Sequence, residues 1–525
     1  MSSDVLTRTR VVLSMLHQRP GESSAEMVAR EKPVLAWTVD RLVEAGFTDL
    51  IVICWDDQLS AVRKLGLAVH NVGVRRPMPR LDALTVATRW HDGWRGGLLN
   101  SSCFDAGWHG AAVAEAFGDD QPIGLLVDPA AAVLDPALLR RVAEKAEQNQ
   151  WSFTPALPGL SGFAFDRDFL RERLAGDEHP GRYLTYTPDR PMVDPLFKTA
   201  GVQVDAALHQ AFDRLLIDSP RQVRRFEELT HVPADAHDAV DAFAEVDADA
   251  LMPRDVTLEI NTQRPTRPVW WAGNTFEIDR PDMNTREADR IFRQLGEVGD
   301  VRVTLGGVGD PLLSPYLPAI LSAARMHGIA LNVETDLLPP DEIVLDLLAE
   351  VDVVTVNLPA MRHETYAAIM GVPRMAEALQ NLGRLVLARS EAKRGTPLVV
   401  PKLVKLRENM DEMEAWYDQW LGTLGSAVID GPSSAAGQLV NLSVTEMKPP
   451  KRVPCRRLGG RMTILSDGQV VRCEEDIRAL HPIGSTHNQT IADLWSAQQH
   501  VHELHLDGEW ETLNLCNTCS EWHRW

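Results

Sequence analysis

The stretch Arg461-Met462-Thr463-Ile464-Leu465-Ser466-Asp467-Gly468-Gln469-Val470-Val471-Arg472-Cys473 predicts a β-hairpin that ends at a cysteine. Two short strand-like runs, residues 461–465 and 469–472, flank Asp467-Gly468, the dipeptide that fits a type I′ turn. A further cysteine, Cys455, precedes the first run. We therefore expect the hairpin to bring Cys455 and Cys473 close together.

The chain has six cysteines, and four of them lie in this C-terminal region with the spacing C-x17-C…C-x2-C: Cys455, Cys473, Cys516 and Cys519. The two-residue gap in the last pair allows one loop to supply two ligands. Thiolate is the ligand type that selects iron-sulfur clusters or zinc, and a set of four satisfies either a cubane cluster or tetrahedral Zn²⁺. The spacing predicts one metal centre, with zinc or plain thiols as the alternatives.

This region resembles the SPASM/twitch extension of radical SAM proteins. The similar residues run from Pro454-Cys455 through the hairpin and Ile483-Gly484 to Leu494-Trp495 and the final CxxC. With four cysteines, the resemblance implies the variant that holds one auxiliary 4Fe-4S cluster. A zinc ribbon normally has two CxxC knuckles, and this sequence has one.

The middle third of the chain alternates strand-like runs with segments of helical periodicity, such as residues 319–326. This alternation predicts a parallel sheet with crossover helices, in which a ligand would sit at the C-terminal ends of the strands. Six units suggest a partial (β/α)6 TIM barrel, the architecture of radical SAM enzymes. The six expected strands are residues 256–260, 301–305, 329–333, 351–356, 398–404 and 427–429.

A glycine-rich segment, Leu305-Gly306-Gly307-Val308-Gly309-Asp310, follows the second of these strands. Glycines allow a ligand to approach the backbone closely, although a tight turn after a strand has the same composition. The segment resembles the GGE-type loop of radical SAM proteins, which receives S-adenosylmethionine. The resemblance implies a cofactor-binding role for Gly306, Gly307, Gly309 and Asp310.

The sequence departs from that family after the first strand. Radical SAM proteins carry C-x3-C-x2-C there, and those cysteines hold the cluster that binds S-adenosylmethionine. Alignment from Leu258-Glu259-Ile260-Asn261-Thr262 places Arg264, Pro268 and Trp271 at the three positions. None of these side chains is a thiolate, so a cluster with an open iron site has no anchor there, and no conventional radical chemistry is expected. Cys54 and Cys103 are expected to be ordinary buried thiols.

The first 230 residues form a separate α/β unit with strand-like residues 11–16 and 50–53 around an amphipathic helix. Short landmarks in this region, among them Lys32-Pro33-Val34-Leu35 and Val127-Asp128, resemble GT-A-type cytidylyltransferases. That resemblance implies a GT-A/Rossmann-like nucleotidyltransferase-type domain. It would place Mg²⁺ at Asp128, supported by Asp135, although a lone aspartate at a strand end is commonly a turn or cap residue. Residues 17–24 contain one arginine and one glycine, a poor cradle for phosphates.

Composition bounds the remaining function classes. Hydrophobic content of 44% and charged content of 24% are values of globular proteins. The net charge of −21 argues against binding to nucleic acid or to an anionic membrane. No apolar run has the length of a signal peptide core or a membrane span, so a cytoplasmic protein is expected.

Two charged groups of the C-terminal region are expected to lie at the surface. Residues 474–476, Glu-Glu-Asp, follow Cys473 and have the composition of a solvated acidic loop. The alternative is that they lie beside the ligands of a cluster and tune its properties. His500, His502 and His505 fall within an expected helix, where surface positions are commoner than metal-ligand positions.

The predicted organisation is an α/β chain with residues 1–230 as the nucleotidyltransferase-like domain, 231–254 as a linker, 255–448 as the partial barrel and 449–525 as a small SPASM/twitch cluster domain. This order, with the missing C-x3-C-x2-C, is similar to the spiro-SPASM group. The resemblance implies a pseudoenzyme, ligand-binding or electron-transfer protein with one 4Fe-4S cluster, whose partner is a small molecule, a nucleotide sugar or a peptide. The alternatives are an active radical SAM enzyme with atypical cluster ligands, or a nucleotidyltransferase.

Overall fold

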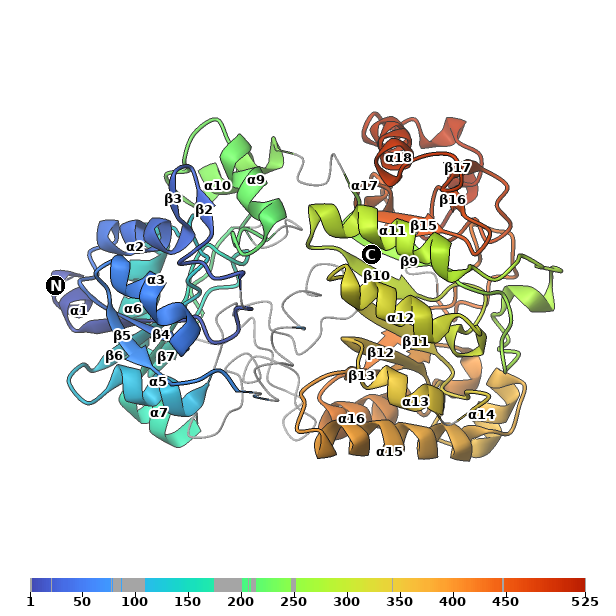
Figure 1. Ribbon diagram of the computed structural model, residues 1–525, viewed down its shortest axis with the longest axis horizontal. Coiled ribbons are helices and arrows are strands. Elements are labelled where there is room, and N and C mark those ends of the chain that lie inside the picture. Colours follow the sequence, from blue (N-terminus) through green and yellow to red (C-terminus); the bar gives the residue numbers. More distant parts are fainter. Residues whose placement is uncertain are drawn as a thin grey trace. The chain divides into compact units, whose positions relative to one another are not determined.

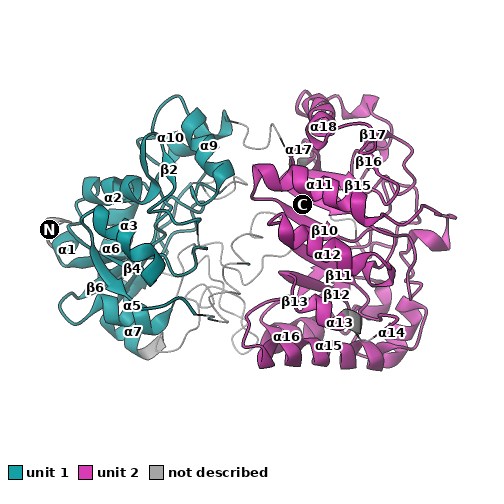
Figure 2. Ribbon diagram, in the orientation of Figure 1, with its two compact units in different colours: residues 1–92, 97–248 teal, residues 93–96, 249–525 magenta. Residues whose placement is uncertain are grey.

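The computed structural model describes residues 2–19, 21–76, 78, 86, 109–173, 201–205, 207–208, 214–246, 252–341, 343–445 and 448–524. These residues form two compact units, one from the part of the chain before residue 249 and one from the part after it (Figure 2). No helix within the described ranges combines the length and the apolar character needed to cross a membrane.

The first unit is built on a six-stranded sheet with the order β5-β4-β1-β6-β8-β7. The first four strands in this order are parallel, and β8 runs antiparallel to both β6 and β7. The predicted strands around residues 11–16 and 50–53 are confirmed as β1 and β4. The strands of this sheet are β1 (Thr9–Ser14), β4 (Asp49–Cys54), β5 (Ala68–Asn71), β6 (Ile123–Val127), β7 (Trp151–Ser152) and β8 (Phe163–Asp166).

Helix α6 shows how the helices of this unit are placed: it buries Leu138, Leu139 and Val142, and its two ends are capped. Asp135 accepts a hydrogen bond from the backbone N–H of Leu138, Pro136 occupies the first turn, and the helix ends at Gln150 in a left-handed conformation. Besides the small pair β2 (Val28–Ala29) and β3 (Lys32–Pro33), the unit contains α1 (Ser2–Thr7), α2 (Val34–Glu44), α3 (Asp56–Lys64), α5 (Gly110–Phe117), α6 (Pro136–Asn149), α7 (Arg167–Arg173), α9 (Pro220–Glu228) and α10 (Ala236–Ala244).

Helix α10 lies inside the segment expected to be a linker, residues 231–254. Phe243 of α10 is fully buried, and the backbone N–H of Ala236 donates to the carboxylate of Asp135 at 2.9 Å. The composition predicted a solvated, partly helical stretch in this linker. The helix forms, but one of its faces is packed rather than solvated.

The second unit is built on a nine-stranded sheet with the order β14-β13-β12-β11-β10-β9-β15-β16-β17. Strands β9 to β14 are all parallel and pair in chain order, with at least one helix between consecutive strands, which confirms the six predicted strands as a parallel sheet with crossover helices. The strands are β9 (Asp255–Leu258), β10 (Arg302–Leu305), β11 (Ala330–Thr335), β12 (Val353–Asn357), β13 (Leu398–Val404), β14 (Val428–Asp430), β15 (Arg461–Ile464), β16 (Gln469–Val471) and β17 (Pro482–Ser485).

Crossover helices pack beside one another outside these strands, and Figure 1 shows α11, α12 and α13 following the chain order. Helix α11 buries Ala288, Ile291, Phe292 and Leu295, a spacing that puts all four on one face. The helices are α11 (Thr285–Val298), α12 (Leu317–Met326), α13 (Ile343–Leu348), α14 (His363–Met370), α15 (Met375–Glu391), α16 (Met413–Leu424), α17 (Arg456–Gly460) and α18 (Ile491–Leu506), with short 3-10 turns η4 (Ala272–Asn274), η5 (Pro311–Leu313), η6 (Arg407–Asn409), η7 (Trp510–Thr512) and η8 (Cys516–Thr518).

The predicted C-terminal hairpin forms from β15 and β16, but two of its features differ from the prediction. A type I′ turn needs two consecutive residues with positive φ, but in this turn only Gly468 has a positive φ, of 78°. The connection is therefore a three-residue loop, closed by the hydrogen bond from the backbone N–H of Leu465 to the carbonyl of Gln469. In addition, β15 pairs in parallel with β9, from Arg461 opposite Asp255 to Ile464 opposite Leu258. The cysteine-rich tail thereby continues the sheet of the second unit instead of forming a detached module.

Candidate functional site

The four C-terminal cysteines come from three short elements. Cys455 precedes α17, Cys473 follows β16, and η8 carries Cys516 with Cys519 directly behind it. All four are free thiols.

The structure brings these cysteines together. Burial, followed by the carboxylate of Glu475 and the charge of Cys455, raises the pKa of Cys473 well above that of an ordinary thiol. Burial and Glu475 raise the pKa of Cys519 to about 12, and burial raises the pKa of Cys516, with Cys455 adding to both shifts. Cys455 is thus an electrostatic neighbour of the other three, and bound metal would have to displace their protons.

The four cysteines lie in one region of the second unit, but they do not surround a single ion position. Within the described part of the chain, no three His, Cys, Asp or Glu side chains form a group that could hold one metal ion.

Two side chains pack around Cys455. Trp522, 5% exposed, packs with Leu458 against Cys455. His505 is buried, in contrast to the expected surface position, and its Nδ1 lies 3.4 Å from the backbone nitrogen of Cys455. Burial and the nearby Arg452 lower the pKa of His505 to about 4, which keeps the ring neutral and able to accept that hydrogen bond.

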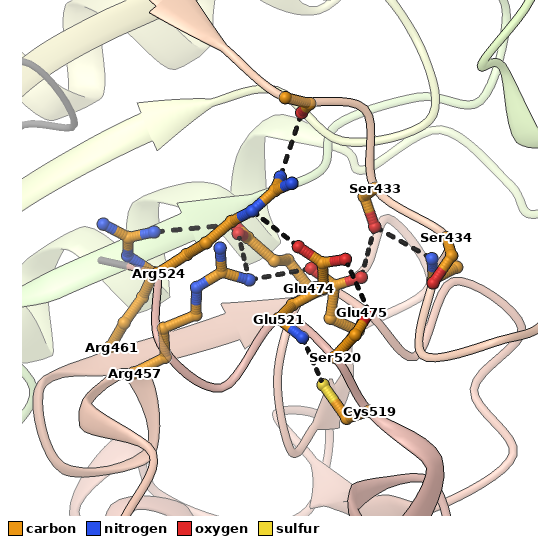
Figure 3. A network of polar contacts seen from close by, with 12 residues as sticks. Ser433, Ser434, Arg457, Arg461, Glu474, Glu475, Cys519, Ser520, Glu521 and Arg524 are labelled. Carbon is orange, nitrogen blue, oxygen red and sulfur yellow. Dashed lines mark hydrogen bonds and ion pairs between the residues drawn. The ribbon is translucent and has the colours of Figure 1, made fainter. Parts of the chain in front are cut away.

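An ion-pair network lies beside the cysteines (Figure 3). Buried Arg457 contacts Glu475 at 2.7 Å and Glu474 at 3.0 Å, and Ser433 donates a hydrogen bond to Glu475. The prediction of a solvated acidic loop at residues 474–476 was wrong, because Glu475 and Asp476 are buried and partnered. Arg457, eighteen positions before Glu475, is the partner that the local pattern did not reveal.

The other side of this network opens into a cavity of about 260 Å³ at the C-terminal ends of the barrel strands, where the sequence predicted a ligand. Side chains from β9 through β15 line it, together with loop residues that follow these strands. Figure 3 shows Arg524 and Glu521 extending the polar network toward Cys519, whose sulfur accepts the backbone N–H of Glu521 at 3.3 Å. Arg457, Glu475 and Arg524 therefore belong both to the cavity lining and to the polar network beside Cys519.

The four predicted cofactor-binding residues of the glycine-rich loop fall into two groups. Gly306 and Gly307 line the cavity, and Gly307 has a φ of 116° that favours glycine. A side chain on Gly309 would lie 2.2 Å from the Asn261 side chain, so this glycine serves packing. Asp310 is buried and accepts hydrogen bonds from Thr335 and from the backbone of Asp336; burial, together with the Asp336 charge, raises its pKa to about 6.

The loop that would carry C-x3-C-x2-C is closed by its own side chains. Arg264 Nε lies 2.8 Å from Asp336 Oδ2 in a buried ion pair, which Thr266 completes with a hydrogen bond. Trp271 Nε1 donates to the carbonyl of Val308 at 2.8 Å, and the Pro268 carbonyl accepts from the backbone N–H of Trp271 at 2.8 Å. Each of the three positions thus has a structural role.

The first unit has a smaller polar site. His17 follows β1 and Asp128 follows β6, and the side chains form a buried pair, His17 Nε2 to Asp128 Oδ2, at 3.1 Å. Asp135, expected to support Mg²⁺ at Asp128, instead caps α6 with one oxygen and binds α10 with the other. Cys54 is buried as expected, and Cys103 lies outside the described residues.

Comparison with known families identifies the tail. Residues 455–520 match the SPASM family, described as an iron-sulfur cluster-binding domain, which confirms the predicted C-terminal cluster domain. A curated relative, an uncharacterized protein from Treponema pallidum (strain Nichols), is 26% identical over 254 residues that cover 46% of this chain and 70% of that protein.

Solved structures with some similarity include SuiB from Streptococcus suis bound to S-adenosylmethionine, with 12% identity, a TM-score of 0.41 and coverage of 57% of this chain and 81% of that one. They also include native anSMEcpe with bound AdoMet, with 11% identity and a TM-score of 0.37; the match covers 51% of this chain and 88% of that one.

Proposed function

We propose that this protein is a radical SAM/SPASM-type iron-sulfur protein with one auxiliary 4Fe-4S cluster and without the cluster that cleaves S-adenosylmethionine. The observation that carries this proposal is the buried ion pair of Arg264 with Asp336 at the position of the first missing cysteine. The domain order favours the spiro-SPASM group. The protein then acts as a pseudoenzyme that binds a ligand in the barrel or passes electrons through the tail.

Cys455, Cys473, Cys516 and Cys519 would hold the cluster, which when bound supplies one-electron transfer. The surrounding residues of the chain have separate roles. Trp522 excludes water from Cys455, the backbone N–H of Glu521 bonds the sulfur of Cys519, and Arg457 places a positive charge next to thiolates. Gly306 and Gly307 leave the cavity edge open to a small ligand.

Iron analysis tests this proposal. Anaerobically purified protein should be brown and contain about four irons per chain. Under dithionite it should form no 5′-deoxyadenosine from S-adenosylmethionine, because no thiolate stands at positions 264, 268 and 271. About eight irons, or deoxyadenosine formation, would instead establish an active radical SAM enzyme with atypical ligands. Colourless protein with one zinc would overturn the iron assignment.

A second candidate is nucleotidyl transfer or nucleotide-sugar binding by the first unit. The chain runs from β1 to β4 and β5 on one side and then to β6 on the other, so β1 and β6 form a topological switch point. In open α/β sheets ligands bind at the carboxyl ends of the strands at such a point, and His17 and Asp128 stand there.

Under this second candidate, CTP with Mg²⁺ should raise the melting temperature of the wild-type protein, and the change Asp128→Asn should abolish that shift because a metal-binding carboxylate is lost. Asp57→Asn, in an exposed ion pair with Arg75, is the control. Equal shifts in wild type and Asp128→Asn would remove Asp128 from the candidate site. Release of pyrophosphate from CTP separates transfer from binding alone.

A further inference from the structure

The floor of the barrel cavity carries a row of small neutral side chains with hydroxyl and amide groups. Thr463 of β15 lies opposite Thr257 of β9, which lies opposite Thr304 of β10, which in turn lies opposite Asn332 of β11. Thr355 of β12 donates to Asn332 at 2.9 Å, and all five residues line the cavity. Barrel interiors are usually filled by branched apolar side chains. This floor instead presents a row of hydroxyl and amide groups.

Thr463 marks the floor as a place for a polar ligand. The residue is 4% exposed, and its hydroxyl has no hydrogen-bond partner among the described residues. A buried hydroxyl without a partner is costly, and such groups are rare in folded proteins. A ligand hydroxyl placed over the floor would supply the missing partner.

The charged side chains of the cavity wall neutralise one another. The pairs that face the space are Glu259 with Arg280, Glu334 with Lys402, Asp430 with Arg524, and Arg457 and Arg461 with Glu474 and Glu475. Arg264 also lines the space and is paired with Asp336. A ligand with a net charge would have to break one of these pairs or remain uncompensated in a partly desolvated space. The wall therefore favours a neutral ligand that uses the paired groups as hydrogen-bond donors and acceptors.

Two tryptophans complete the cavity. Trp270 packs against the barrel core and lines the space, and Trp271 is fixed through its bond to the Val308 carbonyl. A flat aromatic surface suits the C–H face of a saturated ring. The volume of about 260 Å³ lies near the lower end of small-molecule sites, which fits one ring rather than a long peptide.

We infer that the barrel cavity binds a neutral, hydroxyl-rich ring compound, a sugar or a cyclitol, with Thr463 and its neighbours bonding the hydroxyls. This inference rests on the proposed function, since it names the ligand class of the barrel. Thr463→Val keeps the shape of the side chain and removes the hydroxyl, so it should weaken binding about tenfold. Trp270→Leu should also weaken binding, through the lost ring contact.

The test is calorimetric titration of full-length, cluster-loaded protein with glucose, N-acetylglucosamine and myo-inositol, with glutamate and S-adenosylmethionine as charged comparators. Thr154→Val is the matched control, because Thr154 is also buried with an unpartnered hydroxyl but lies in the first unit. Binding of a neutral probe that weakens in Thr463→Val and not in Thr154→Val supports the inference.

Binding of the charged comparators alone, binding of no probe, or an unchanged affinity in Thr463→Val overturns the inference. Without ligand, Thr463→Val should melt at or above the wild-type temperature, whereas a purely structural threonine would lower it. The iron count of the same preparation tests the proposed function separately. Protein that contains the cluster but does not bind the neutral probes contradicts only the inference. Protein without iron contradicts the proposed function, whatever the titration shows.

Discussion

Replacing Cys516 by serine should lower the iron content of anaerobically purified protein from about four atoms per chain to near zero. Serine offers a hard hydroxyl in place of the thiolate that iron-sulfur clusters require. Cys516 is buried, and the main-chain carbonyl of the same residue accepts a hydrogen bond from Arg452 at 2.8 Å, so the loop has little freedom to recruit another ligand. Loss of visible absorbance and of iron measures the effect.

Cys54→Ser is the matched control for that experiment. Cys54 is also a buried free thiol whose pKa is raised by burial, to about 11, but it belongs to β4 of the first unit. Iron content should be unchanged in this variant. Retention of a full cluster in Cys516→Ser would show that the four cysteines do not act as one ligand set.

The change Arg264→Met should destabilise the second unit by about 3–5 kcal/mol, because it leaves the carboxylate of Asp336 buried without its cation. Asp336 is fully buried and lies next to Asp310, so the loss of Arg264 also leaves two acidic groups facing each other. Chemical denaturation monitored by circular dichroism measures the change in the free energy of unfolding.

Two variants separate this effect from the loss of a long side chain. The double variant Arg264→Met with Asp336→Asn should be more stable than Arg264→Met alone, since no buried charge is then left unpaired. Arg374→Met removes an arginine from a half-exposed ion pair with Glu377 and should have a much smaller effect. A small loss in Arg264→Met, similar to that in Arg374→Met, would mean that the ion pair does not hold the loop closed.

The sequence predicted the barrel strands well because strands buried between helices carry continuous β-branched and apolar runs, as in β12 and β13. It did not predict that β15 pairs with β9. Pairing between strands so far apart in the chain depends on tertiary contacts that no local pattern encodes, and the alternation in residues 461–465 would fit any neighbour.

The candidate site shows the same division. Identity and spacing of the cysteines predict one centre, because thiolate is a specific kind of ligand, and this remains a prediction. The surroundings were not predictable, because a charged run such as residues 474–476 has the composition of a surface loop unless its distant partner is known. Gly309 was predicted to bind the cofactor, but a glycine is required there because a side chain would collide with Asn261. Sequence alone cannot distinguish a glycine needed for packing from one that lets a ligand approach the backbone.

The junction of β9 with β15 also constrains how this unit can assemble. Strand β9 pairs with β10 on one side and with β15 on the other. Because β15 lies roughly 200 residues later in the chain, the second pairing is a contact of high sequence separation and is expected to form late. Until β15 pairs with it, β9 is an edge strand whose unpaired backbone N–H and C=O groups can pair with other chains and cause aggregation. Cys455 precedes β15 and Cys473 follows the hairpin that β15 begins. If these cysteines hold the cluster proposed above, insertion of the cluster and completion of the sheet would be steps of a single maturation process.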